Sequence, residues 1–339
     1  MEALQVTWFL LVGILLIGYA ILDGFDLGVG VLYIFTRKEE DRRVCLNAIG
    51  PVWDGNEVWL LTGGGALFAA FPYVYATVFS GFYLALILLL VALIARAVSM
   101  EFRGKVDSPG WKRVWDWCFG LGSLLPAVLF GVAFGNILRG LPIDIDGSYH
   151  GTFLGLLNPY AILIGVLSLL LFAMHGAIYL ALKSDAELRV RATKTASTLW
   201  MLVVLVYAAA TFVTTFVSPF LFFTVLGNVI FWVLFILLLA SLLMIPVWLK
   251  GKRFFLAFLS SSTMFGTMIG LSALSLFPRL VPSTISDDYS LNVFHHSSSQ
   301  LTLTVMLVIA LIGMPLVIVY TIMVYRVFKG KVSIGPDSY

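Results

Sequence analysis

The chain has near its start an apolar stretch, residues 7–33, which reads TWFLLVGILLIGYAILDGFDLGVGVLY. It is longer than the roughly 20 residues that an α-helix needs to cross a bilayer. Two charged side chains, Asp23 and Asp26, interrupt it. A charge at membrane depth costs about 3 kcal/mol or more unless it is paired or hydrated. The stretch therefore predicts a membrane-spanning helix, and its two acids are candidates for a functional role.

The composition extends this interpretation to the whole chain. Hydrophobic residues make up 60% of it and charged residues only 12%, against about 25% charged residues in a typical soluble domain. A soluble protein of this size could not hide so much apolar surface. We therefore expect an all-α integral membrane protein. The net charge of +3 is small and gives no reason to expect a nucleic-acid partner.

Further apolar stretches follow and predict about nine transmembrane helices in a single polytopic membrane domain, residues 1–339. The connections between them are too short to hold a soluble domain. The third span begins almost directly after Pro72, so the second and third spans are expected to form a tight hairpin. The predicted spans are about 5–35, 52–72, 75–100, 116–138, 158–182, 196–217, 223–249, 254–277 and 301–328.

Lysine and arginine residues alternate strictly between the connections. All but Arg96, Arg139 and Arg279 lie in the first, third, fifth and seventh connections and in the C-terminal tail. Loops rich in Lys and Arg stay in the cytoplasm. The alternation therefore predicts an outside N-terminus and a cytoplasmic C-terminus.

Asp23 and Asp26 are three residues apart, so they share one face of the first helix. Asp23 lies 16 positions after Thr7, which is about 24 Å along a helix. Both carboxylates are therefore expected in the inner half of the bilayer.

The second and third spans add polar groups at the same depth. Asp54, Asn56 and Glu57 open the second span, and Arg96 lies near the inner end of the third. Buried carboxylates near like charges can take up and pass on protons. We interpret the whole group as a proton site or entry path. The structural alternative is that Arg96 neutralises one acid while others cap helix starts.

Other polar residues allow simpler interpretations. Glu101 and Asp116 are expected to be interfacial charges. His175, the one histidine well inside a span, could ligate a haem, but a hydrogen bond to a neighbouring helix is the preferred interpretation. The remaining histidines and the two cysteines are expected to form neither a metal site nor a disulfide. They are His150, His295, His296, Cys45 and Cys118.

Glycines recur inside the predicted spans. Gly63–Gly65 do not follow a strand, so a phosphate-binding loop is not expected. Small residues let helix backbones approach closely in membranes. Close helix packing is therefore predicted at Gly63–Gly65 and at Gly24, Gly28 and Gly30.

Several segments, in order along nearly the whole chain, resemble subunit II of cytochrome bd-type quinol oxidases. The most specific is Trp53–Trp59, which reads WDGNEVW. The others are Gly18–Gly30, Asn47–Val52, Gly63–Pro72, Ser80–Tyr83, Trp115–Trp117, Gly131–Asn136, Leu157–Tyr160 and Ser298–Thr302.

The resemblance implies two four-helix bundles plus one peripheral helix, in the cell membrane of a bacterium or archaeon. It implies a non-haem subunit that helps a terminal oxidase to assemble, to oxidise quinol and to reduce O2 to water, with proton uptake from the cytoplasm. The haems b and d and the quinol site are then expected on a partner, subunit I, and no catalytic, cofactor or metal residue is expected in this chain. A small single-helix accessory subunit and a structural quinone or lipid stay open.

By the same resemblance, Asp54 matches a carboxylate of a proton route shared with subunit I, and Asp23 and Asp26 match first-helix acids. Glu57 stands where some relatives have Gln, which adds an acid. Two alternatives stay open at this point. A proton-coupled secondary transporter would work without a haem partner. A haem-binding cytochrome would need a second axial ligand for His175 within the membrane.

Overall fold

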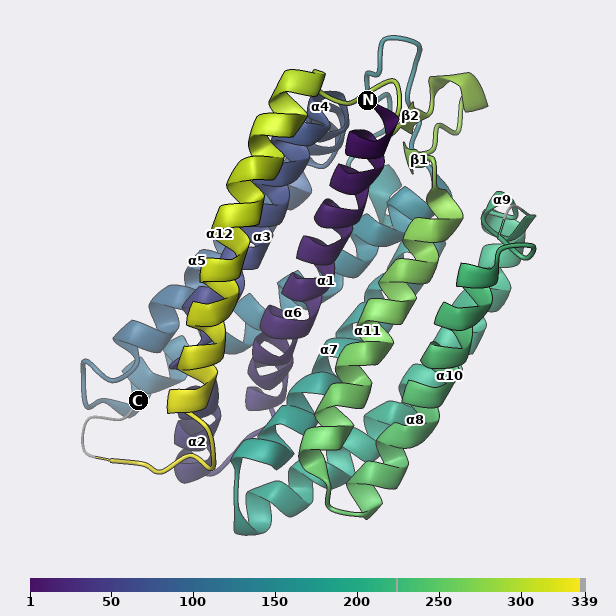
Figure 1. Cartoon of the computed structure of the whole chain (residues 1–339). Coiled ribbons are helices and arrows are strands. Elements are labelled where there is room, and N and C mark those ends of the chain that lie inside the picture. Colours follow the sequence, from purple (N-terminus) through teal and green to yellow (C-terminus); the bar gives the residue numbers. More distant parts are fainter. Residues whose placement is uncertain (224, 336–339) are drawn as a thin grey trace.

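A computed structural model gives the structure of residues 1–223 and 225–335. Over these residues the chain is almost entirely helical, with two 3-10 turns and one two-stranded hairpin (Figure 1). The helices are α1 (Glu2–Tyr33), α2 (Glu39–Ile49), α3 (Trp53–Ala70), α4 (Pro72–Gly81), α5 (Tyr83–Phe102), α6 (Pro109–Arg139), α7 (Pro159–Lys183), α8 (Ala186–Val217), α9 (Phe220–Phe223), α10 (Val229–Lys250), α11 (Phe254–Leu276) and α12 (Gln300–Val327). The 3-10 turns are η1 (Leu154–Leu157) and η2 (Asp287–Tyr289), and the strands are β1 (Arg279–Val281) and β2 (Leu291–Asn292).

The long helices form two bundles. The first contains α1, α3, α5 and α6, and the second contains α7, α8, α10 and α11. The two bundles meet where α7 packs against α1 and α6. Helix α12 lies at the periphery beside α1 and α3, and Leu303 is its one buried residue. The expected fold class, two four-helix bundles plus one peripheral helix, is confirmed.

Eight of the helices in residues 1–223 and 225–335 are long and apolar enough to cross a membrane: α1, α5, α6, α7, α8, α10, α11 and α12. The second predicted span corresponds to α3, which is not among them because Asp54, Asn56 and Glu57 open it. Its 18 residues give about 27 Å, close to the roughly 30 Å of a hydrocarbon core. The count of about nine therefore includes one short, polar helix.

The third predicted span is not one continuous helix. It divides into α4 and α5 at Phe82. Helix α4 is held by the loop after α6, because the Thr77 hydroxyl donates a hydrogen bond of 2.7 Å to the carbonyl of Gly147. A Cβ at Gly81 would lie 2.9 Å from the Tyr149 ring. The interruption follows from this packing between distant segments, which a hydropathy pattern does not contain.

Helices α1 and α7 cross at backbone contact. A Cβ added at Gly28 would lie 1.9 Å from the carbonyl oxygen of Phe172, and one at Gly176 would lie 2.4 Å from the carbonyl carbon of Gly28. Gly24 and Gly30 likewise face neighbouring side chains too closely for a Cβ. The prediction of close helix packing is confirmed for these glycines of α1.

Within the part of this chain that the structure describes, the Gly63–Gly65 run does not make the predicted close helix contact. A Cβ at Gly63 would make an ordinary contact of 3.5 Å with Leu16, and one at Gly64 or Gly65 would have no atom of the described chain within 4 Å. These two glycines lie on the face of α3 that the rest of the chain does not cover.

The two ends of the molecule differ in charge. The end that holds α2, the α5–α6 and α7–α8 connections and the C-terminal segment has most of the lysines and arginines, and we call it the basic end (Figure 1). The N-terminus, β1 and β2 lie at the opposite end.

Candidate functional site

Two acids and one arginine lie buried in the middle of the first bundle. Asp23 and Asp26 of α1 and Arg96 of α5 each have 0% of their surface exposed. An Arg96 Nη atom lies 2.9 Å from Asp23 Oδ1, which makes a fully buried ion pair. This pairing is the structural role that the sequence left open for Arg96. It satisfies one carboxylate and leaves Asp26 without a cation of its own.

Asn56 of α3 links Asp26 to a third helix. Its Nδ2 donates to Asp26 Oδ2 at 2.7 Å and to the carbonyl of Leu22 at 3.2 Å. Its Oδ1 accepts a hydrogen bond of 2.9 Å from the hydroxyl of Tyr325 in α12. Tyr325 was not predicted from the sequence, since 269 positions separate it from Asn56 and a tyrosine near the end of a span usually indicates an interfacial anchor.

Several polar atoms of this cluster have no hydrogen-bond partner in the described part of the chain. They are Asp26 Oδ1 and Arg96 Nε and Nη1. Buried polar groups are normally paired, so such a concentration indicates positions for protons or water. The cluster places two carboxyl groups beside one guanidinium, so its acidic groups outnumber its cation. The arrangement is chemically suited to storing and passing on a proton.

The two remaining acids of α3 lie differently. Glu57 is half-buried and within electrostatic reach of Arg96 and Asp23. Asp54 is exposed on the surface of the chain. The structure therefore joins Asp23, Asp26, Asn56 and Arg96 by direct contacts, leaves Glu57 at the edge, and does not bring Asp54 into the buried cluster.

A second polar cluster lies at the basic end, centred on Asp116 of α6. Its carboxylate accepts hydrogen bonds from Tyr33, from Arg42 at 2.7 Å and from Arg103 at 2.6 Å. Burial by itself lowers the pKa of Arg103, but its bonds to Glu39 and Asp116 raise that pKa above the usual value. The expectation that Asp116 is an interfacial charge stays a prediction; the structure adds that Asp116 is 7% exposed and ties α1, α2 and α6 together.

His175 of α7 is fixed by its neighbours. Its Nδ1 lies 2.7 Å from the Ser261 hydroxyl of α11, and its Nε2 lies 3.1 Å from the carbonyl of Ile21 in α1. Its ring stacks on Phe258 with the centroids 4.7 Å apart. Both ring nitrogens are thus engaged, so this residue does not fit an axial haem ligand and instead joins three helices.

The remaining histidines lie in the connections at the opposite end. His150 Nε2 is 2.6 Å from Asp144, and this hydrogen bond lowers the pKa of the Asp144 carboxyl. His296 Nδ1 accepts a bond from the backbone of Asn292. Over residues 1–223 and 225–335, no three His, Cys, Asp or Glu residues are grouped as a metal site would need. Cys45 and Cys118 are free thiols.

The chain is similar to known proteins over nearly its whole length. Residues 4–328 match the family of cytochrome bd terminal oxidase subunit II. The chain is 40% identical to the probable cytochrome oxidase subunit 2 of Haemophilus influenzae, over 98% of this chain and 96% of that protein. It is 36% identical to the cytochrome bd-I ubiquinol oxidase subunit 2 of Escherichia coli K12, with the same coverage. It is 39% identical to the cytochrome bd ubiquinol oxidase subunit 2 of Bacillus subtilis, over 98% of each chain.

A solved structure has the same fold. The bd oxidase from Geobacillus thermodenitrificans contains a chain that superposes with a TM-score of 0.74 at 14% identity, over 96% of this chain and 99% of that one. The class defined by fold and sequence is thus the integral membrane subunits of terminal oxidases. The chain belongs to the cytochrome bd terminal oxidase subunit II family. This membership does not favour the alternative of a secondary transporter.

Proposed function

We propose that this chain is the non-haem subunit of a quinol-oxidising terminal oxidase and that it supplies part of the route by which protons reach the site of O2 reduction. Its relatives in E. coli and B. subtilis are named as ubiquinol oxidase subunits. The one histidine inside a long helix has both nitrogens engaged. This supports the proposal that the haems b and d and the quinol site lie on a haem-bearing partner, subunit I.

The observation that carries the proton role is the buried cluster of Asp23, Asp26, Asn56 and Arg96. An ion pair alone would explain one acid, but the second acid is equally buried, and its hydrogen-bond partner among the described residues is the amide of Asn56. A second buried carboxylate is costly and is retained in membranes mainly where ions or protons move. Arg96 pairs with Asp23, so Asp26 is the acid of the cluster placed to take up the proton.

Asp54 and Glu57 extend this route towards the surface of α3. Glu57 lies at the edge of the buried cluster, and Asp54 lies on a face that the rest of this chain leaves exposed. An acid on that face is open to contact with another molecule, which fits a route shared with subunit I. The complex sits in the cell membrane with the basic end in the cytoplasm. Lipid surrounds it, a single-helix accessory subunit can join it, and a structural quinone or lipid can fill gaps between helices.

A spectrum tests the subunit assignment. The chain is tagged, purified in mild detergent from its own host, and examined by reduced-minus-oxidised optical spectroscopy. We expect haem b and haem d bands together with a second, haem-bearing protein. A colourless, monodisperse protein without a partner would contradict the assignment.

Substitutions test the proton role. In the purified complex, Asp26→Asn is expected to reduce quinol-driven O2 consumption by about 100-fold or more, the usual contribution of a positioned proton-transfer group. Asp54→Asn is expected to slow it as well. The control is Asp107→Asn, an exposed acid of the α5–α6 connection, which should leave turnover unchanged. Full activity of Asp26→Asn with normal haem content would contradict the route.

A further inference from the structure

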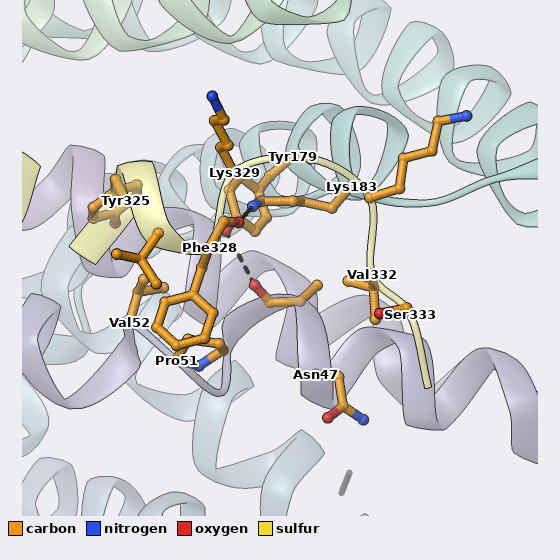
Figure 2. A pocket seen from close by; sticks show the side chains of 14 residues that line it. Asn47, Pro51, Val52, Tyr179, Lys183, Tyr325, Phe328, Lys329, Val332 and Ser333 are labelled. Atoms are coloured by element: carbon orange, nitrogen blue, oxygen red, sulfur yellow. Dashed lines mark hydrogen bonds between the residues drawn. The ribbon is translucent and has the colours of Figure 1, made fainter. Parts of the chain in front are cut away.

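A cavity of about 240 Å³ opens at the basic end, next to the buried cluster (Figure 2). Its inner wall is formed by Val52 after α2 and by Tyr179 of α7, both buried. Its outer wall is the segment that follows α12, residues 327–333, which includes the exposed Phe328. The cavity therefore lies between the body of the protein and its C-terminal segment.

The C-terminal segment is held in place over this cavity. The ammonium group of Lys183 donates a hydrogen bond of 2.6 Å to the carbonyl of Phe328, drawn as a dashed line in Figure 2. The backbone N–H of Val332 donates to the carbonyl of Lys183 at 2.9 Å. Lys331 pairs with Asp185 at 2.6 Å. These contacts fix the outer wall of the cavity. They engage Lys183 and Lys331, two of the lysines that line it.

Tyr325 joins the cavity to the buried acids. Its side chain lines the cavity, and in Figure 2 it lies beside Val52. Its hydroxyl donates to Asn56 Oδ1 at 2.9 Å, and Asn56 Nδ2 donates to Asp26 Oδ2 at 2.7 Å. The hydrogen-bonded connection from the cavity to Asp26 therefore consists of one tyrosine and one amide.

We propose that this cavity is the water-filled entrance through which protons reach Asp26, and that Tyr325 is the positioning residue that closes it. The inference rests on the proposed proton role and names its entry point. An amide does not readily pass a proton on, so the Tyr325–Asn56 hydrogen bond holds the route closed. When Tyr325 swings aside, a water from the cavity reaches Asp26. One O–H bond of a hydronium ion in the cavity breaks and a new O–H bond forms on the Asp26 carboxylate, which leaves a water molecule. Bulk water then supplies another proton to the cavity.

Blocking the cavity gives the first test. Val332→Cys places a thiol in its outer wall, and the complex is reacted with a bulky, membrane-impermeant thiol reagent. We expect about a tenfold loss of O2 consumption on modification, equal to about 1.4 kcal/mol in the barrier. The matched control is Val106→Cys, which lies at the same end, is 45% exposed, and does not line the cavity. Its activity should not change.

Accessibility gives the second test. Asn56→Cys places a thiol behind Tyr325, and its rate of modification by a small, water-soluble reagent is measured by mass spectrometry. The rate should rise about tenfold when Tyr325→Ala is added, because the side chain that separates the cavity from position 56 is gone. Ser123→Cys, buried in α6 away from the cavity, should react at the same slow rate with either residue at 325.

The outcomes separate this inference from the proton role itself. If Asp26→Asn abolishes turnover but modification of Val332→Cys leaves it intact, protons enter elsewhere and the entrance is refuted. Equal losses in Val332→Cys and Val106→Cys would refute it too. If Asp26→Asn is fully active, the proton role fails irrespective of the cavity. Where the Asn56→Cys variant does not assemble, the Val332→Cys comparison decides.

Discussion

At the scale of single residues, Arg96 is a charged side chain with none of its surface exposed. Its guanidinium is fully buried, makes one ion pair with Asp23, and leaves Nε and Nη1 without partners in the described chain. A buried pair adds little net stability over an apolar pair of similar size, but breaking it leaves one charge uncompensated. Replacing only one of Asp23 and Arg96 is therefore expected to destabilise the fold more than replacing both.

This dependence gives a prediction for stability. Arg96→Gln should lower the free energy of unfolding by about 3–5 kcal/mol, because the Asp23 carboxylate then stays buried without its cation. Adding Asp23→Asn should recover much of that loss. Thermal unfolding of the purified complex, followed by haem release, measures both. A double variant no more stable than Arg96→Gln would show that the two residues are not coupled.

Cys45 of α2 allows a prediction outside the membrane helices. Burial raises the pKa of its thiol to about 12. At pH 8 only about one thiol in 10⁴ is then ionised, and the thiolate is the reactive form. Iodoacetamide at pH 8 should leave Cys45 unmodified in the folded complex and modify it in denaturant, as read by mass spectrometry. Because the pKa of the Cys45 thiol is raised in the folded state, its contribution to the free energy of unfolding is fully present at any pH below the ordinary thiol pKa. That contribution is lost as the pH rises towards 12.

Among the elements, the contact between α1 and α7 fixes the acids relative to the second bundle. Gly28 and Gly176 allow the two backbones to touch. His175, one residue before Gly176, reaches the carbonyl of Ile21 across the same contact. Helix packing in membranes relies on such close approach because lipid tails are as apolar as the helices themselves.

Two glycines of α1 provide a matched pair of substitutions. Gly28→Ala should destabilise the fold by at least about 1–3 kcal/mol, because its Cβ would overlap the Phe172 carbonyl oxygen. In Gly13→Ala, the added Cβ would have no other atom of residues 1–223 and 225–335 packed within 4 Å, so the change should be neutral or stabilising by up to about 1 kcal/mol, the helix preference of alanine over glycine. Thermal stability of the two variants measures the difference. Equal effects would show that the close contact is not required.

At the scale of the whole molecule, the two ends have different surfaces. The basic end contains the cavity and the Asp116 cluster, and the opposite end contains β1, β2 and the loops with His150 and His296. Most lysines and arginines lie at the basic end, which predicts that it faces the cytoplasm. The proposed proton entrance then opens on the side from which protons are taken.

Cysteine labelling in intact cells tests this orientation. Ile145→Cys lies in a loop of the opposite end, where Ile145 is 76% exposed, and should react with a membrane-impermeant thiol reagent. Val106→Cys, at the basic end, should react only after the membrane has been opened. The reverse pattern would place the entrance on the outer side and contradict cytoplasmic uptake.

The sequence alone determined the membrane class, the approximate positions of the helices and the presence of Asp23 and Asp26 inside the first of them. Hydrophobicity over about 20 residues is a local property, and the charge of a side chain at membrane depth has a cost wherever the helix packs. The segment Trp53–Trp59, together with the other segments that resemble subunit II, also identified the family correctly.

Only the tertiary structure decided which polar groups meet. Tyr325 reaches Asn56 because α12 returns beside α3, and Asp116 is buried because α2 folds over the end of α1. Likewise Asp54 and Asn56, two residues apart, point respectively to the surface and into the cluster because of how α3 is rotated against α1. Such contacts depend on helix rotation and on neighbours far away in the chain, and a local pattern of hydrophobicity determines neither.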